Sequence, residues 1–258
     1  MHNILLVSSF LLRKWLACLI ALMLISAPAM AVQKDASEWF REISDLRGLS
    51  GSFSFSLQVT SYRNEVAEAQ SQLEVLFQSH QQILILFRQP QNSAGRRILV
   101  EGDNMWLTLP SSKRVLRVSP SQRLLGEASN GDVINTNFAD YQLQQQQDVE
   151  RDGKRYIALT LVATNSRQSY QRVVYLIDPL SSLPSISLHY TASQKLIKEI
   201  HYENYVTTAG KPRVERLRLI NPVQPDRYTI MQLSQFTART FPAGIFKKEN
   251  LLNAVIRE

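Results

Sequence analysis

The feature that most constrains the fold of this chain is an alternation of apolar and polar residues that returns in one segment after another. Within residues 52–60 the apolar residues are Phe53, Phe55, Leu57 and Val59, and serine or glutamine stands between them. Successive side chains of a β-strand point to opposite faces of a sheet. The spacing therefore predicts a strand with one apolar face and one wet face.

Segments of the same kind follow along most of the chain, separated by turn residues. Leu73, Val75 and Phe77 alternate with polar residues, whereas 83–87 is apolar on both faces and needs a cover on each side. An Asp-Gly pair within 151–154 predicts a tight hairpin. The other expected strands are 97–101, 105–109, 113–119, 141–149, 156–163, 170–178, 184–191, 195–205, 214–221 and 228–240.

Helical patterns are confined to three places. Trp39, Phe40 and Ile43 fall on one helical face, which predicts a short helix within residues 35–46. Residues 120–140 are turn-rich and predict a long loop with one or two short helices, one of them capped by Asp132. A short C-terminal helix is expected at 248–256. The sequence thus predicts a mainly β protein, with about ten or eleven antiparallel strands in a curled sheet and the first two helical regions as candidate lids.

The first 31 residues have the layout of a secretory signal peptide. Arg13 and Lys14 precede an apolar run at 15–25, and an Ala-Met-Ala sequence at 29–31 forms a small-residue cleavage site. The run is shorter than the roughly 20 residues that span a bilayer, which favours cleavage over a retained anchor. We expect residues 1–31 to be a cleaved signal peptide and residues 32–258 to form a single domain.

The expected export of the protein changes the interpretation of its net positive charge. The sequence carries 29 basic and 22 acidic side chains, a formal net charge of +7. In a cytosolic protein this balance would indicate nucleic acid as a partner, but an exported protein meets anionic lipid surfaces instead, so we expect no nucleic-acid partner. Cys18, the only cysteine, lies within the expected signal peptide. We therefore expect no disulfide and no thiolate chemistry in the mature chain.

Motifs for catalysis and metal binding are missing from the sequence. His80, His189 and His201 fall in separate segments without the spacing of metal ligands. No G-x-S-x-G sequence marks a nucleophilic serine, and there is no glycine-rich phosphate loop. Neighbouring strands can bring two carboxylates together, but nothing singles out a pair. We expect no metal, no cofactor and no enzymatic activity.

Several segments together resemble one family. The segment GDNMWLTLPSSKRVLRVS (102–119) resembles the signature block of the periplasmic LolA-like proteins, the outer-membrane lipoprotein-sorting proteins of the LolA/LolB lipoprotein-carrier superfamily. The segment ASNGDVINTNFADY is similar to the loop and short helix that follow that block. HYTASQKLIKEIHYENY and FPAGIFKKENL are similar to the family's late strand and terminal segment. The resemblance covers about residues 35–255.

The resemblance implies a strongly curved, unclosed antiparallel β-barrel, a half-barrel, around an apolar cavity with short helices as its lid. It implies a non-catalytic periplasmic carrier of lipid or lipoprotein acyl chains for transfer to the outer membrane. An inner-membrane exporter and an outer-membrane acceptor are its expected partners. Thr108 stands where an aromatic residue is usual and Lys113 where arginine is common, so the identity of the cargo does not carry over.

Candidate binding residues follow from the expected half-barrel with its cavity and lid. We expect the lid to contact cargo through Trp39, Phe40 and Ile43. Arg114 and Arg117 are candidate contacts for a lipid head group, or else solvated arginines that protect a sheet edge. The apolar candidates either line a cavity or fill a closed core. Those for the cavity wall are Phe53, Phe55, Leu57, Val75, Phe77, Leu107 and Leu109.

Two other functions stay open. One is a periplasmic adaptor that docks on an RND-type envelope exporter without carrying lipid, which predicts a dry, fully packed interior. The other is a lipid-modifying enzyme, which predicts a reactive polar constellation inside the cavity. Lipid that co-purifies with the protein distinguishes the carrier from the adaptor.

Overall fold

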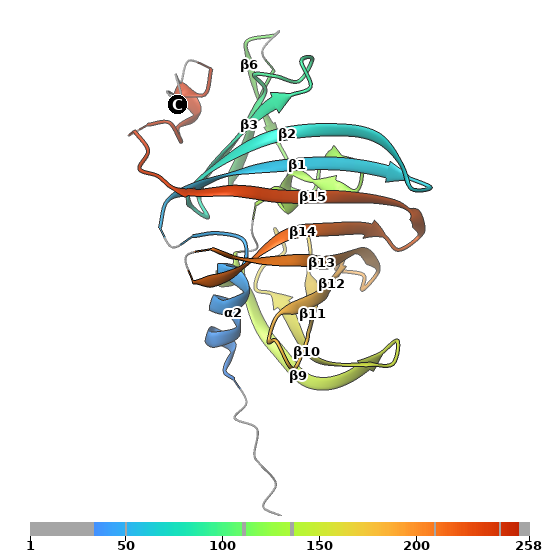
Figure 1. Cartoon of the computed structure of the whole chain (residues 1–258). Helices are drawn as coiled ribbons and strands as arrows, with labels where there is room; N and C mark the ends of the chain where they lie inside the picture. Colours follow the sequence, from blue (N-terminus) through green and yellow to red (C-terminus); the bar gives the residue numbers. More distant parts are fainter. Residues whose placement is uncertain are drawn as a thin grey trace, which may run out of the picture. The chain divides into compact units, whose positions relative to one another are not determined.

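Among the described residues, thirteen antiparallel strands form one continuous curved sheet that is not closed into a barrel (Figure 1). The computed structural model describes residues 34–49, 51–109, 112–134, 137–208, 210–242 and 244–252. The predicted signal peptide, residues 1–31, lies outside the described residues. The half-barrel class is confirmed, with more strands than the ten or eleven expected.

Two meanders make up the sheet. The first runs through β1 (Phe53–Arg63), β2 (Val66–Ser79), β3 (Gln82–Gln89), β4 (Arg97–Glu101), β5 (Asn104–Leu109) and β6 (Arg114–Val118). The second runs through β9 (Tyr141–Arg151), β10 (Lys154–Ala163), β11 (Arg172–Ile177), β12 (Pro184–Tyr190), β13 (Leu196–Thr208), β14 (Lys211–Asn221) and β15 (Gln224–Ala238). Because β1 pairs with β15, the meanders join at these two strands, and β6 and β9 are the edges.

The connection between the meanders contains an inserted segment (residues 119–134) that packs on the inner face of the sheet. It holds β7 (Arg123–Leu125), β8 (Ala128–Ser129) and α3 (Asn130–Val133), and η1 (Phe138–Asp140) follows it. The expectation that Asp132 caps a helix is wrong. Asp132 is the third residue of α3, Ser129 holds the N-cap position, and the Asp132 carboxylate accepts hydrogen bonds from the Ser129 backbone N–H and hydroxyl, both at 2.7 Å.

The inner face carries two apolar clusters. The larger combines inner residues of β1–β5 and β13–β15 with Ala128 and Val133 of the inserted segment. The smaller lies on β10 and β11, where helix α2 (Ala36–Asp45) buries Trp39 and Ile43 against the sheet. Both regions expected to act as lids therefore pack on the inner face.

Strand β3 is covered on both faces, as its continuous apolar sequence predicts. Ile83, Ile85 and Phe87 belong to the larger inner cluster, whereas Leu84 and Leu86 lie on the outer face. The chain after β15 covers that outer face with Ile245, Phe246 and Leu251. Its described part contains η2 (Lys248–Asn250), a short 3-10 helix rather than the helix expected at 248–256, and residues 253–256 lie outside the described residues.

Candidate functional site

Two adjoining pockets lie on the inner face of the sheet, beside the C-terminal end of α2 and the inserted segment. The apolar pocket has a volume of about 340 Å³ and the polar pocket about 270 Å³. Arg47, His80 and Ile134 line both pockets, so the two spaces meet at these residues.

The apolar pocket is built by the alternation of β1 and β2. Their register places Phe53 opposite Phe77 and Phe55 opposite Val75. The rings of Phe53 and Phe77 stack with their centroids 4.8 Å apart. These four side chains share the inner face because they are two residues apart along each strand. The other apolar lining residues are Leu49, Ile83, Val133 and Ile134.

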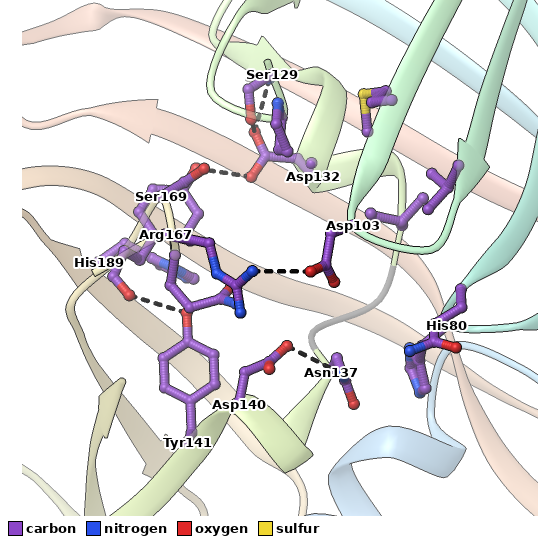
Figure 2. Close-up of a pocket in the computed structure, with 18 of the residues that line it drawn as sticks. His80, Asp103, Ser129, Asp132, Asn137, Asp140, Tyr141, Arg167, Ser169 and His189 are labelled. Carbon is purple, nitrogen blue, oxygen red and sulfur yellow. Dashed lines mark hydrogen bonds and ion pairs between the residues drawn. The ribbon is translucent and has the colours of Figure 1, made fainter. Parts of the chain in front are cut away.

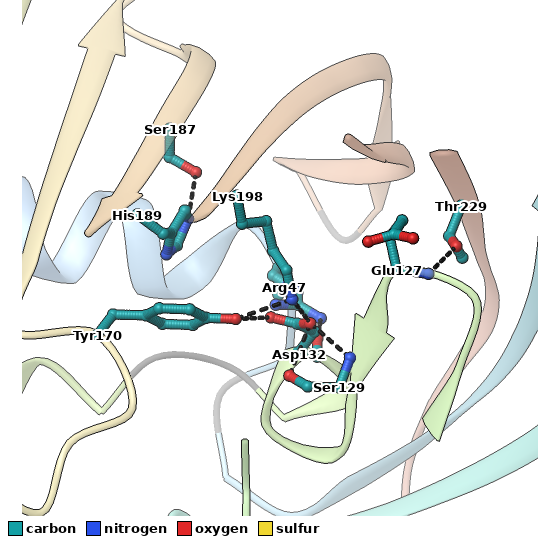
Figure 3. A network of polar contacts seen from close by, with 9 residues as sticks. All are labelled: Arg47, Glu127, Ser129, Asp132, Tyr170, Ser187, His189, Lys198 and Thr229. Carbon is teal, nitrogen blue, oxygen red and sulfur yellow. Dashed lines mark hydrogen bonds and ion pairs between the residues drawn. The ribbon is translucent and has the colours of Figure 1, made fainter. Parts of the chain in front are cut away.

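The polar pocket centres on a buried carboxylate, Asp132, at the end of the inserted segment (Figure 2). Lys198 of β13 forms an ion pair with Asp132, and Tyr170 donates a hydrogen bond to the same carboxylate at 2.9 Å. The Lys198 ammonium also donates to the Tyr170 hydroxyl at 2.8 Å (Figure 3). Burial alone would raise the pKa of Asp132, but the charge and hydrogen bonds of Lys198 and those of Ser129 outweigh it and lower this pKa.

His189 lies beside this network as a buried imidazole. One ring nitrogen, Nε2, is 2.8 Å from the Ser187 hydroxyl, and the ring stands edge-on to the Tyr170 ring at 4.5 Å between centroids. Burial lowers the pKa of His189 to about 3, an effect that Asp132 opposes and that Lys198 reinforces. The ring is therefore neutral at neutral pH, and its Nδ1 has no hydrogen-bond partner among the described residues.

Arg47 connects the end of α2 with the inserted segment. Its Nη2 donates hydrogen bonds to the backbone carbonyl oxygens of Asp132, at 2.7 Å, and Val133, at 3.4 Å. Burial lowers the pKa of Arg47, and the nearby Tyr202 and Asp132 oppose this effect. The guanidinium stays protonated because the ordinary pKa of arginine is far above neutral.

The mouth of the polar pocket is bridged by an exposed ion pair. Arg167 Nη1, in the β10–β11 connection, lies 2.8 Å from Asp103 Oδ2, in the β4–β5 turn (Figure 2). The side chains keep 72% and 69% of their surface exposed, so solvent screens the attraction. The pair joins strands of the two meanders across the pocket.

The part of the chain that the structure describes shows neither a metal-binding cluster nor a membrane-spanning helix. There, no group of three or more His, Cys, Asp or Glu side chains is arranged to hold a metal ion. No helix among the same residues combines the length and the apolar character that crossing a membrane requires.

The residues predicted from sequence fall at several places in the structure. Phe53, Phe55, Val75 and Phe77 line the apolar pocket, and Ile43 lines the polar pocket. The remaining candidates line neither pocket. Leu57 and Leu107 pack in the larger inner cluster, Trp39 and Phe40 in the smaller one, Leu109 lies partly buried on β5, and Arg114 and Arg117 are exposed on the edge strand β6.

Sequence reasoning did not select Arg47, Tyr170, His189 or Lys198 as site residues. Each lies in or beside an expected element, but only the tertiary structure brings the four to Asp132, which is 66 residues from Lys198. The one local signal is the turn-rich stretch that holds Asp132, because a long loop inside a compact domain is often functional.

The solved structures that are similar to this chain include the following three. A LolA superfamily protein from Nitrosomonas europaea is 25% identical with a TM-score of 0.76, and the match covers 84% of this chain and 99% of that one. An outer membrane lipoprotein-sorting protein domain from Vibrio parahaemolyticus is 20% identical with a TM-score of 0.69, covering 84% and 97%. A DUF1329 family protein from Desulfovibrio piger is 18% identical with a TM-score of 0.67, covering 85% and 100%.

Comparison with protein sequences gives a family but no curated relative. No curated protein sequence matches the chain. A family model described as "Uncharacterized protein" matches residues 79–253, which is more than half of the sequence. The chain therefore belongs to this family, and its fold is that of the LolA superfamily.

Proposed function

We propose that the protein is a non-catalytic carrier that shields acyl chains of lipids or lipoproteins in the interior of its half-barrel. The observation that carries the proposal is the apolar pocket between β1–β3 and the inserted segment, with its aromatic wall and its opening into a polar pocket. The fold shared with a LolA superfamily protein supports it.

The free energy of burying an acyl chain and the volume of the apolar pocket favour such a role. Burying one methylene group stabilises a complex by about 0.8 kcal/mol, so a modest length of chain suffices for binding. A volume of about 340 Å³ lies at the lower end of the range of ligand pockets, about 300–1,000 Å³, and suits a single chain. Release needs a movable cover, for which α2, with Trp39, Phe40 and Ile43, and the inserted segment are the candidates.

The proposed place of action is the periplasm. With residues 1–31 removed as a signal peptide, the protein acts in the periplasm and delivers its cargo towards the outer membrane. An inner-membrane exporter is the proposed donor and an outer-membrane component the proposed acceptor. The family resemblance of the sequence supports this assignment.

Binding of N-phenyl-1-naphthylamine, an uncharged apolar fluorescent probe, tests the proposal. Leu49 lines the apolar pocket, so Leu49→Trp should fill part of it and weaken binding about tenfold, the loss of roughly two buried methylene groups. Leu180 is 96% exposed in the β11–β12 turn, so Leu180→Trp is the matched control and should bind like the original chain.

Two results would contradict the carrier. One is failure of the original chain to bind the probe, which would favour an adaptor with a closed interior. The other is unchanged binding by Leu49→Trp, which would place the probe outside the apolar pocket. Circular dichroism and urea unfolding of both variants establish that the comparison is made between folded proteins.

A further inference from the structure

One cation that lines the two pockets, Arg47, forms no ion pair with a carboxylate among the described residues. Every carboxylate that lines them is engaged by another side chain. The partners are Lys211 for Asp45, Arg167 for Asp103, Lys198 for Asp132 and the Asn137 amide for Asp140. Arg47 lines both pockets, yet among the described residues no carboxylate pairs with it.

The surroundings of Arg47 make the absence of an ion-pair partner costly. Its hydrogen bonds go to the two backbone carbonyls of the inserted segment, and its Nε is buried without a hydrogen-bond partner among the described residues. A guanidinium that is partly removed from water and has only a shared counter-charge is under-compensated. Lys198 adds a second positive charge nearby against the single charge of Asp132. Arg47, Lys198 and Asp132 together therefore carry one more positive charge than negative.

The position of Arg47 decides what could supply the missing charge. Arg47 is only partly buried, and it stands where the polar and apolar pockets meet. From there the apolar pocket continues to the phenylalanine wall of β1 and β2. A ligand that places a negative group at Arg47 and an alkyl tail against Phe53 and Phe55 satisfies both surfaces.

We propose that Arg47 anchors the carboxylate of a single-chain anionic amphiphile, of the fatty-acid type, whose tail lies in the apolar pocket. The planar guanidinium matches a carboxylate in geometry as well as charge. The volume of about 340 Å³ suits one tail better than the several chains of a lipoprotein anchor. This inference rests on the proposed carrier function and names its cargo class.

Three amphiphiles with one tail and different heads test it: dodecanoate, dodecanol and dodecyltrimethylammonium, each measured by displacement of N-phenyl-1-naphthylamine. The original chain should bind dodecanoate about tenfold or more tightly than dodecanol, the ratio expected for one charge-assisted hydrogen bond, and the cationic head least tightly. In Arg47→Gln the preference for dodecanoate over dodecanol should disappear, whereas Arg47→Lys should keep part of it.

The quantity compared is the ratio of the affinities of one protein for dodecanoate and dodecanol. A general loosening of the inserted segment changes both affinities alike and cancels in this ratio. Arg155 is exposed on β10 and lines neither pocket, so Arg155→Gln is the matched control and should keep the preference. Equal affinity of the original chain for dodecanoate and dodecanol, or a preference unchanged in Arg47→Gln, overturns the inference but leaves the carrier intact. Failure of the probe and all three amphiphiles to bind overturns both.

Discussion

The inner face of the sheet has two walls of opposite character. Over β1 and β2 it is a row of stacked phenylalanines with a pocket beside it. Over β12 and β13 the inward residues include Ser187, His189 and Lys198, all of them buried. Ser187 and His189 are hydrogen-bonded to each other, and Lys198 contacts Tyr170 and Asp132 from other segments. The difference teaches that one face of a single sheet can provide an apolar surface for binding and a polar network that holds the inserted segment in place.

The largest expected effect comes from breaking the buried ion pair. Lys198→Met removes the ion-pair partner of the buried Asp132 carboxylate, which should lower the free energy of unfolding by about 3–5 kcal/mol. Urea denaturation measures this loss. In the double variant Lys198→Met/Asp132→Leu the stranded carboxylate is removed, and part of the stability should return; the rest stays lost because Ser129 and Tyr170 lose their acceptor. A double variant as unstable as the single one would show that the charge is not the cause.

The apolar wall could be predicted from the sequence and the polar wall could not, for a physical reason. Phe53 and Val75 stand in strict alternation, and burial of apolar surface needs no particular partner. In β12, alternation separates Ser187 and His189 from Ile186 and Leu188 but does not tell which pair points inward. In the structure the polar pair does, and Ile186 and Leu188 pack on the outer face.

The residues that contact the polar wall could not be predicted from the sequence either. Lys198 lies in an expected strand and Asp132 in an expected loop, but their contact depends on how the inserted segment folds back on the sheet. Arg47 follows the first helix and reaches the same segment through backbone carbonyls, which carry no sequence signal.

A second prediction uses the pH dependence of stability to test the polar wall independently of the apolar wall. The pKa of His189 is lowered to about 3, whereas an unfolded histidine titrates near 6.5. As pH falls through this interval the unfolded chain binds a proton that the folded chain does not, so stability falls by about 1.4 kcal/mol per pH unit from this group alone. In His189→Gln the unfolding free energy, measured by urea denaturation between pH 6 and 4, should fall less steeply by this amount.

The charged groups around His189 do not disturb that comparison. Asp132, whose pKa is also lowered, adds a loss of the same sign at lower pH, but it is present in both proteins. Arg47 keeps its charge through this range, because the ordinary pKa of arginine is far above it. Identical slopes for the two proteins would mean that His189 takes up a proton as readily in the folded chain as in the unfolded one.

The smallest expected effect concerns the mouth of the polar pocket. A double-mutant cycle of Asp103→Asn and Arg167→Gln should give a coupling energy of about 0.2–1 kcal/mol in urea unfolding, because both side chains are largely exposed. The coupling should shrink further at high salt. A coupling well above this range, insensitive to salt, would indicate that the pair closes the pocket as a structural latch rather than as a surface contact.

The central claim, that the apolar wall holds a lipid, is tested most directly by the mature protein purified without detergent. Organic extraction followed by mass spectrometry should release an acyl-chain lipid from the original chain and less of it from Leu49→Trp, with Leu180→Trp unchanged. An interior from which no lipid is extracted, and which takes up none when lipid is added, would contradict the account.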